Sequence, residues 1–305
     1  MKLEGIHHIT AITENAQRNV DFYAGVMGLR LVKKTVNQDN PTVYHLFYAD
    51  EEGDAGADLT FFEYPGAPVG RAGVGMVHRI VWRVGMPESL DFWEGRLGAH
   101  GIDTRRTGEG LHFADPEGLE HELLVADVPD KPLIADHPEV PRELALQGFH
   151  AVRAYAAAPE TSTALLEALE FERTGEGWEA RGVERGGFYV YDPPPADVRP
   201  LQGAGTVHHV AWASSLEEPM AWRERARSAG ARPTGEIDRF YFKSVYFREP
   251  SGVLFEVATL GPGFTVDEPL EHLGEKLSLP PAFEHLRDEV EPKLRPVVNP
   301  RATLT

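Results

Sequence analysis

Two pairs of adjacent histidines stand in apolar segments that are far apart in the chain. His7 and His8 lie in GIHHITAI, and His208 and His209 lie in GTVHHVAWA. A third candidate is Glu256 in SGVLFEVAT, because a carboxylate inside an apolar strand is costly unless it is paired or bound to a metal. Two imidazoles and one carboxylate leave positions open on a divalent metal, which is the pattern of non-haem Fe(II) oxygenases. Zn(II) and Mn(II) accept the same ligands.

An internal repeat separates the two members of each histidine pair. Four units begin near residues 5, 75, 147 and 205, and each opens with an apolar strand. The first histidine of that strand recurs in all four units, which ties it to the fold: His7, His78, His150 and His208. The next position varies, and only the first and fourth units place a histidine there: His8, Arg79, Ala151 and His209. We therefore expect His8 and His209 to be the metal ligands.

The second unit contains a counterpart of Glu256. The segment DPEG, residues 115–118, leads into Glu122 with the spacing by which EPSG, residues 249–252, leads into Glu256. The variable histidine position of that unit is Arg79. This predicts an ion pair between Glu122 and Arg79 in a unit that holds no metal.

Each unit predicts one strand, one amphipathic helix and two or three further strands, bounded by turns rich in Gly, Pro and Asp. The helices are expected at residues 16–27, 87–98, 160–170 and 217–229. The fold class is therefore α+β, built from four βαβββ modules. We expect modules one and two within 1–135, modules three and four within 145–262, and a non-repeating tail over 263–305 with one helix near 281–291. Module one should pair with module four, because His8 must meet His209 and Glu256.

The composition excludes several classes of function. The chain of 305 residues has 30 basic and 48 acidic residues and a net charge of −18, which argues against binding nucleic acids or anionic membranes. Without cysteine there is no disulfide, Cys-ligated zinc or cysteine nucleophile. No signal peptide and no run of about 18 apolar residues is visible, so we expect a cytoplasmic protein. A homo-oligomer is compatible with the sequence, which does not fix the oligomeric state.

The sequence resembles the vicinal oxygen chelate superfamily of glyoxalase I, bleomycin-resistance proteins and extradiol dioxygenases. Within it, the chain is similar to the ring-cleaving dioxygenases that act on hydroquinones. The resemblance spans nearly the whole chain and is carried by LEGIHHITAITENAQRNVDFYAGVMGLRLVKK (3–34), VYHLFYAD (43–50), residues 147–150 and 206–209, and YFKSVYFREPSGVLFE (241–256). It implies four βαβββ modules paired into two barrel-like halves. It also implies that His8, His209 and Glu256 hold Fe(II).

The resemblance implies five further site residues. They are Thr10 and Arg239 as substrate-binding groups, and His7, His208 and Tyr246 as candidate acids or bases. Thr10 follows His8 by two residues, so strand alternation puts both on one face. The same alternation turns His7 and His208 to the opposite face unless the strands twist or bulge. Arg239 would neutralise an oxyanion, and Tyr246 would donate a hydrogen bond.

The implied activity is insertion of O₂ into a hydroquinone- or catechol-type aromatic, so the partners would be a small aromatic substrate and O₂. One alternative is a glyoxalase-like metal-dependent isomerase or thiol transferase, which would favour a fourth ligand such as Glu63. The sequence LTFFEYPG favours an unpaired surface position for Glu63. A second alternative is a non-enzymatic small-molecule binder, which would have no use for the set of His8, His209 and Glu256.

Overall fold

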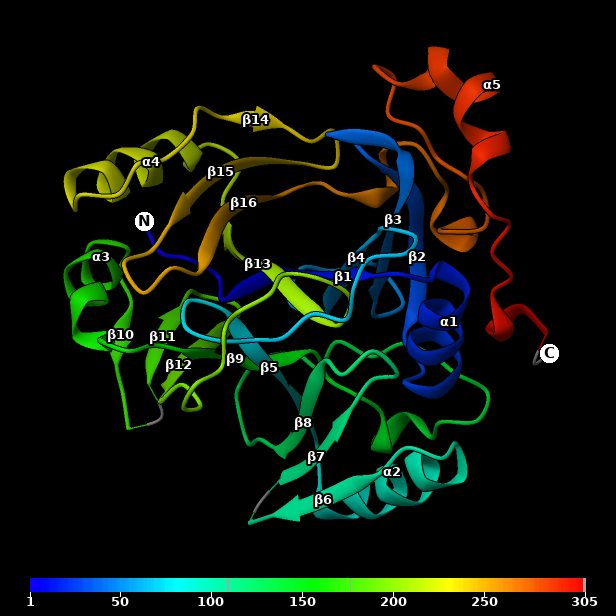
Figure 1. Ribbon diagram of the computed structural model, residues 1–305, viewed down its shortest axis with the longest axis horizontal. Helices are drawn as coiled ribbons and strands as arrows, with labels where there is room; N and C mark the ends of the chain where they lie inside the picture. Colours follow the sequence, from blue (N-terminus) through cyan, green and yellow to red (C-terminus); the bar gives the residue numbers. More distant parts are fainter. Residues whose placement is uncertain (109, 176, 304–305) are drawn as a thin grey trace.

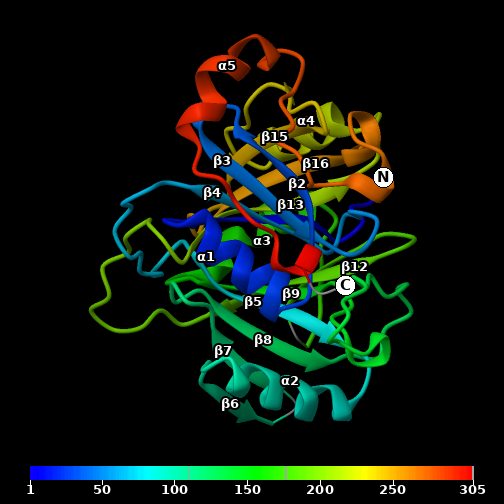
Figure 2. The same cartoon turned by 90° about the vertical axis from the view of Figure 1, so that its right-hand side faces the viewer.

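The computed structural model describes residues 1–108, 110–175 and 177–303, which form two curled, eight-stranded sheets. Figure 1 shows the sheets one above the other, and Figure 2 shows the same stacking from the side. The α+β fold with two barrel-like halves is confirmed. In the described part of the chain, no helix is long and apolar enough to cross a membrane.

The first sheet joins the first module to the fourth. Its strand order is β14-β15-β16-β13-β1-β4-β3-β2. The central strands β1 and β13 pair antiparallel, and this pairing brings together His8 and His209, which are 201 positions apart in the chain. The strands are β1 (Ile6–Thr13), β2 (Arg30–Asn37), β3 (Asn40–Ala49), β4 (Asp58–Glu63), β13 (Thr206–Ser214), β14 (Ile237–Asp238), β15 (Phe242–Arg248) and β16 (Leu254–Pro262).

The second sheet joins the second module to the third in the same way. Its order is β10-β11-β12-β9-β5-β8-β7-β6, with β5 and β9 antiparallel at the centre. Each half of the protein is thus a sheet built around two opening strands. The strands are β5 (Val77–Val84), β6 (Thr104–Thr107), β7 (Gly110–Ala114), β8 (Glu120–Val125), β9 (Phe149–Tyr155), β10 (Glu172–Arg173), β11 (Trp178–Arg181) and β12 (Gly186–Asp192).

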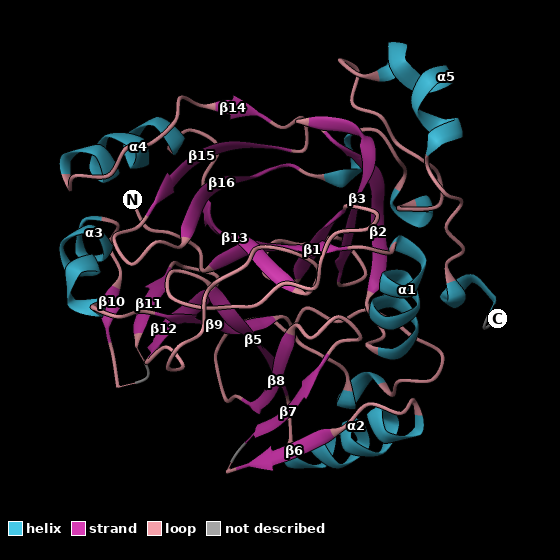
Figure 3. Cartoon of the chain, in the orientation of Figure 1, coloured by secondary structure: helices cyan, strands magenta, loops and turns pink. Residues whose placement is uncertain are grey.

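One helix per module lies at the periphery of the two sheets, as Figure 3 shows. The Asn15 side chain caps the first helix by accepting a hydrogen bond from the backbone N–H of Arg18. Proline occupies the first turn of α2 and α4, where its missing N–H costs nothing. The four helical segments fall within two or so residues of the predicted ranges: α1 (Ala16–Val20) with the π-helical η1 (Asp21–Val26), α2 (Pro87–Ala99), η3 (Pro159–Ser162) with α3 (Thr163–Ala168), and α4 (Pro219–Ser228).

Each opening strand contains a β-bulge at the recurring histidine. In the first sheet Ile6 pairs with Trp212 and His8 with Ala211, so His7 is the extra residue. The register shift between Thr10 and Ala11 leaves His208 as the extra residue of β13. The shifts between β5 and β9 fall at His78 and His150. A bulge breaks the alternation of side chains, so the rule that would turn His7 and His208 away from their neighbours does not hold there.

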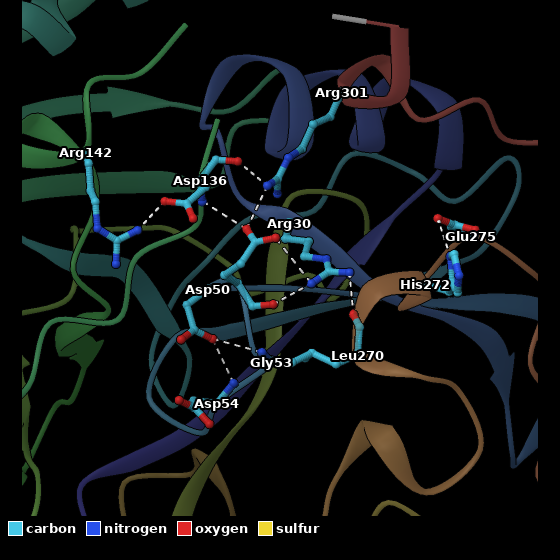
Figure 4. A network of polar contacts seen from close by, with 11 residues as sticks. Arg30, Asp50, Gly53, Asp54, Asp136, Arg142, Leu270, His272, Glu275 and Arg301 are labelled. Carbon is cyan, nitrogen blue, oxygen red and sulfur yellow. Dashed lines mark hydrogen bonds and ion pairs between the residues drawn. The ribbon is translucent and has the colours of Figure 1, made fainter. Parts of the chain in front are cut away.

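The C-terminal tail packs against the first module, and Figures 1 and 2 show it beside β2 and α1. Figure 4 shows two of its attachments: Arg30 donates to the backbone oxygen of Leu270 at 2.6 Å, and Arg301 pairs with Glu51 at 2.7 Å. The predicted helix near 281–291 is a succession of short turns. The tail elements are η4 (Phe264–Val266), η5 (Leu270–His272), η6 (Glu284–Leu286), α5 (Arg287–Val290), η7 (Glu291–Lys293) and η8 (Pro300–Thr303).

Candidate metal centre

Three buried ligand atoms converge inside the first sheet. The Nε2 atoms of His8 and His209 are 3.3 Å apart, and Glu256 Oε2 lies 3.2 Å from the first and 2.9 Å from the second. His8, His209 and Glu256 are 2 %, 4 % and 0 % exposed. Metal–ligand bonds of about 2.1 Å at right angles separate two donor atoms by about 3 Å. The three atoms therefore have the spacing of three donors that share one metal ion.

The carboxylate of Glu256 shows that this group fits a cation. Its Oε1 accepts a hydrogen bond from Ser244 Oγ, whereas its buried Oε2 faces only the Nε2 atoms of His8 and His209, the other two ligand atoms of the group. A buried oxygen without a donor costs about 1–3 kcal/mol, and more when it is charged. A divalent cation bound by His8, His209 and Glu256 would satisfy that oxygen.

Hydrogen bonding fixes which nitrogen of His8 can bind a metal. The backbone oxygen of Thr259 can only accept, so His7 Nε2, 3.0 Å away, carries a hydrogen. Burial and the neighbouring His8 lower the pKa of His7 to about 3, so the ring is neutral and its Nδ1 accepts. The donor is His8 Nδ1, 3.0 Å from His7 Nδ1. The remaining nitrogen, His8 Nε2, then presents its lone pair to the centre of the group.

The fourth module repeats this arrangement around His209. Its Nδ1 lies 2.8 Å from Nδ1 of His208, the residue that forms the bulge of β13. Burial and His209 lower the pKa of His208 to about 4, and burial also lowers the pKa of His209. Burial alone would raise the pKa of Glu256, but the two ligand histidines lower it well below its usual range. At neutral pH His209 is thus a neutral imidazole and Glu256 an ionised carboxylate.

A cavity of about 370 Å³ opens beside the three ligand atoms. Six of the eight predicted site residues line it: His8, Thr10, His208, His209, Arg239 and Tyr246. Glu256 lies beneath this surface, and His7 lies behind His8, against a neighbouring cavity. Most of the remaining wall is aromatic or apolar: Phe47, Phe62, Tyr64, Tyr241, Phe242 and Leu254.

The pairing register of the strands shows which residue of the first module stands at the position equivalent to Glu256. In the fourth module Ala211 pairs with Glu256, and the position equivalent to Ala211 in the first module, Thr10, pairs with Thr60. Thr60 therefore occupies the place of a fourth ligand. Its Oγ1 is already hydrogen-bonded to Thr10 Oγ1 at 2.8 Å and to His45 Nε2 at 2.9 Å.

Glu63 lies outside this group, and the expected surface position was wrong. Its side chain is buried, and Oε1 accepts the backbone N–H of Ala16 at 2.9 Å, at the start of α1. The carboxylate thus satisfies a free N–H of the first helical turn. Along β4, Glu63 comes three residues after Thr60, the residue that pairs with Thr10. The sequence does not reveal this offset, because the first module has a longer loop before β4.

Sequence reasoning missed three residues of the site: His45, Thr60 and Ser244. The segment TVYHLFYA places His45 among apolar and aromatic residues of a strand, and a histidine in such a position could have been taken as a candidate site residue. Ser244 could have been found only from its pairing in β15, opposite Ala258 of β16.

The second sheet carries the predicted ion pair where the first carries the ligands. Arg79 Nη1 lies 3.3 Å from Glu122 Oε2, and His112 Nε2 lies 3.3 Å from Glu122 Oε1. Glu122 pairs with Val81 in the register by which Glu256 pairs with Ala211. A guanidinium thus supplies the positive charge that the equivalent carboxylate needs.

A family model described as the Glyoxalase/Bleomycin resistance protein/Dioxygenase superfamily matches residues 5–84 and 75–257. The chain belongs to this superfamily. The resemblance found in the sequence is therefore confirmed. The superfamily fold is also shared by glyoxalase I from Zea mays, with a TM-score of 0.58 at 14 % identity over 84 % of this chain and 92 % of that one.

Relatives within this superfamily match over nearly their full length. The Bacillus subtilis protein named "Putative ring-cleaving dioxygenase MhqA" is 40 % identical over 97 % of this chain and 100 % of its own. The "Chlorohydroquinone/hydroquinone 1,2-dioxygenase" of Sphingobium indicum is 31 % identical over 95 % of each chain. A crystal structure of a Bacillus subtilis protein, also titled a dioxygenase, superposes with a TM-score of 0.89 at 37 % identity over 98 % of each chain.

Proposed function

We propose that the protein is an Fe(II)-dependent ring-cleaving dioxygenase of hydroquinone- or catechol-type aromatics. The observation that carries this proposal is the group of His8, His209 and Glu256 at the wall of the cavity, with Thr60 at the fourth register position. Three protein ligands on one face leave positions for a substrate oxygen and for O₂. The names of the full-length relatives support this activity.

The chain's own residues would bind and orient the ring. Fe(II) held by His8, His209 and Glu256 would relay electrons from the aromatic ring to O₂ and would supply the positive charge that acidifies a substrate hydroxyl. Tyr246 can donate its O–H to a substrate oxygen, and Arg239 can stabilise negative charge there. His208 lines the same cavity, and because its Nδ1 accepts from His209 Nδ1, its Nε2 carries a hydrogen that it can donate to a substrate oxygen. One ring C–C bond breaks and both atoms of O₂ enter the product, so no external reductant is needed.

The isomerase alternative needs a fourth protein ligand, and among the described residues no further His, Asp or Glu places a ligand atom within 4.8 Å of those of His8, His209 and Glu256. Thr60 at the equivalent position offers only a hydroxyl, and that hydroxyl is hydrogen-bonded to Thr10 and His45. Glu63 is committed to the N-terminus of α1. Mn(II) and Zn(II) remain the other metals that the three ligands accept.

The test is O₂ uptake by protein reconstituted anaerobically with Fe(II), with hydroquinone and catechol tested in turn. We expect one O₂ consumed per ring lost. Glu256→Ala should lose bound iron and at least 100-fold in turnover, because it removes a ligand. Glu122→Ala is the matched control, since it removes the equivalent carboxylate of the second sheet and should keep both iron and turnover.

Stoichiometric iron without O₂ uptake on either aromatic would refute the proposed oxygenation. Retention of iron by Glu256→Ala would show instead that the metal lies elsewhere. Equal losses in Glu256→Ala and Glu122→Ala would show that the two substitutions act through the stability of the fold.

A further inference from the structure

The two edges of the first sheet touch each other beside the cavity. The turn between β2 and β3 belongs to one edge, and the loop between β14 and β15 to the other. Figure 1 shows the β2–β3 turn meeting the end of β14 at the top of the view. Gln38 Nε2 donates to the backbone oxygen of Arg239 at 2.7 Å, which joins the two segments.

A bidentate ion pair between Arg239 and Asp39 lies at this junction. Arg239 Nη1 is 3.2 Å from Asp39 Oδ1, and Arg239 Nη2 is 3.1 Å from Asp39 Oδ2. The two side chains differ in exposure: that of Asp39 is 74 % exposed and that of Arg239 only 19 %. Asp39 therefore stands at the rim, whereas Arg239 reaches inward.

The inner end of Arg239 belongs to the site itself. Its guanidinium carbon lies 5.5 Å from the ring centroid of Tyr246, and the Tyr246 ring packs edge-on against that of the ligand His209, with centroids 5.7 Å apart. A ring bound next to the three ligands would thus meet Tyr246 and Arg239. The guanidinium is the group that an anionic substituent of that ring would seek.

The lining of the cavity holds a pair of opposite permanent charges. Among the described residues that line it, Arg239 is the only Lys or Arg and Asp39 the only carboxylate. An ionised substituent would therefore have to pass Asp39 and compete with it for Arg239, whereas an apolar substituent would meet Phe47, Phe62 or Leu254.

We propose that Asp39 determines specificity by restricting the site to aromatic diols without an ionised substituent. This inference rests on the proposed function and adds the substrate class. Carboxylated hydroquinones are disfavoured by Asp39 relative to alkyl-substituted ones, whose substituent would pack against the apolar wall. The effect is moderate, because an ion pair with one partner exposed is worth little. A factor of about two to five in relative kcat/KM is expected.

The test compares Asp39→Asn with the Fe(II)-loaded wild type on methylhydroquinone and 2,5-dihydroxybenzoate. The variant should raise the ratio of kcat/KM for the carboxylated substrate over the methylated one by about two- to fivefold, mostly through KM. Glu236→Gln is the matched control. It removes the same charge from an exposed ion pair with Lys243, near the same loop, and should leave the ratio unchanged. An unchanged ratio in Asp39→Asn, or an equal rise in both variants, would overturn the proposal.

A binding measurement separates this proposal from the proposed function. Both aromatics are titrated anaerobically into the Fe(II)-loaded proteins, and their Kd values are compared by calorimetry. If Asp39→Asn shifts the Kd ratio but the wild type turns over neither aromatic, the role of Asp39 in charge selectivity is supported and the proposed dioxygenase activity is refuted. If the wild type turns over methylhydroquinone but Asp39→Asn leaves the Kd ratio unshifted, the proposed dioxygenase activity is supported and the role of Asp39 is refuted.

Discussion

At the scale of single residues, the candidate metal centre depends on groups that orient the ligands. Ser244, fully buried in β15, donates its hydroxyl hydrogen to Glu256 Oε1 and leaves Oε2 to face the two imidazoles. The backbone oxygen of Thr259 orients His8 through His7. Each ligand is thus held by a second residue, and such partners typically change metal affinity by 10- to 100-fold.

Ser244→Ala should weaken metal binding by about tenfold or more, because the carboxylate of Glu256 loses the donor that orients it. Chelator competition on the purified protein measures this affinity. Ser244→Thr, which keeps a hydroxyl, should recover most of it. Unchanged affinity in Ser244→Ala would show that the β-strand backbone alone holds the carboxylate.

Individual site residues differ in how far the sequence could predict their positions. Comparison of the four repeats singled out His8, His209 and Glu256, which the structure brings within 3.3 Å of one another; metal binding by them stays a prediction. Comparison of the repeats could not identify Thr60, because a long loop in the first unit shifts the following residues relative to those of the other units. Nor could it find the contact of Asp39 with Arg239, because that contact depends on how far the sheet curls.

At the scale of elements, the bulges of the opening strands explain the histidine that recurs in all four modules. A regular strand would send His7 and His8 to opposite faces. The bulge brings their Nδ1 atoms to 3.0 Å, and the bulge of β13 brings those of His208 and His209 to 2.8 Å. Hydrophobic alternation predicts that a strand exists but not where it holds an extra residue, so this feature could not be predicted from the pattern.

The tail is a second element whose role depends on one buried residue of β2. Lys33 is fully buried, and its Nζ lies 2.7 Å from Asp267 Oδ1 and also contacts Glu268. Asp267 Oδ2 in turn accepts a hydrogen bond from Tyr241, a residue of the cavity wall. The tail therefore supports the wall of the candidate site.

Lys33→Met should detach this part of the tail, because it leaves two carboxylates without their cation. We expect a loss of about 2–4 kcal/mol in the free energy of unfolding, since both carboxylates are mostly buried. Limited proteolysis should cut near residues 264–270 earlier than in the wild type. Lys276→Met, an exposed lysine of the tail, is the control. Equal proteolysis of Lys33→Met and wild type would contradict this role.

At the scale of the whole molecule, the sequence repeat was enough to predict four modules in an α+β fold. A buried chain of hydrogen bonds links the helix of the first module to the second sheet. Trp82 Nε1 donates to His121 Nδ1 at 3.1 Å, so His121 Nε2 carries the hydrogen toward Tyr23, 3.0 Å away. Tyr23 donates in turn to Asp115 at 2.9 Å. Because Trp82 donates to His121 Nδ1, that nitrogen cannot carry a hydrogen, so His121 must be neutral.

This chain predicts a specific acid sensitivity. Burial lowers the pKa of His121 to about 3, so the folded state resists a proton that the unfolded chain takes up near pH 6.5. The stabilisation is complete above pH 6.5 and is lost progressively as the pH falls toward 3, by at most about 5 kcal/mol. His121→Gln, which cannot titrate, should be less stable at pH 7.5 but should lose less stability between pH 6.5 and 4.

Urea unfolding at several pH values measures this difference. Asp115, whose pKa burial raises to about 6, titrates in the opposite sense and is present in both proteins. Its contribution therefore largely cancels in the comparison. Parallel pH profiles of wild type and His121→Gln would show that His121 is not the sensitive group.

The pairing of the first module with the fourth has a consequence for synthesis. The second sheet is made from one continuous stretch, Val77–Asp192, and can close while the fourth module is still being translated. β1 must wait for β13, and at about 5–20 residues per second that wait is on the order of ten seconds or more. During this time the nascent chain exposes the edge of β1 that carries His7 and His8. The sheet that holds the candidate site is thus begun first on the ribosome and completed last.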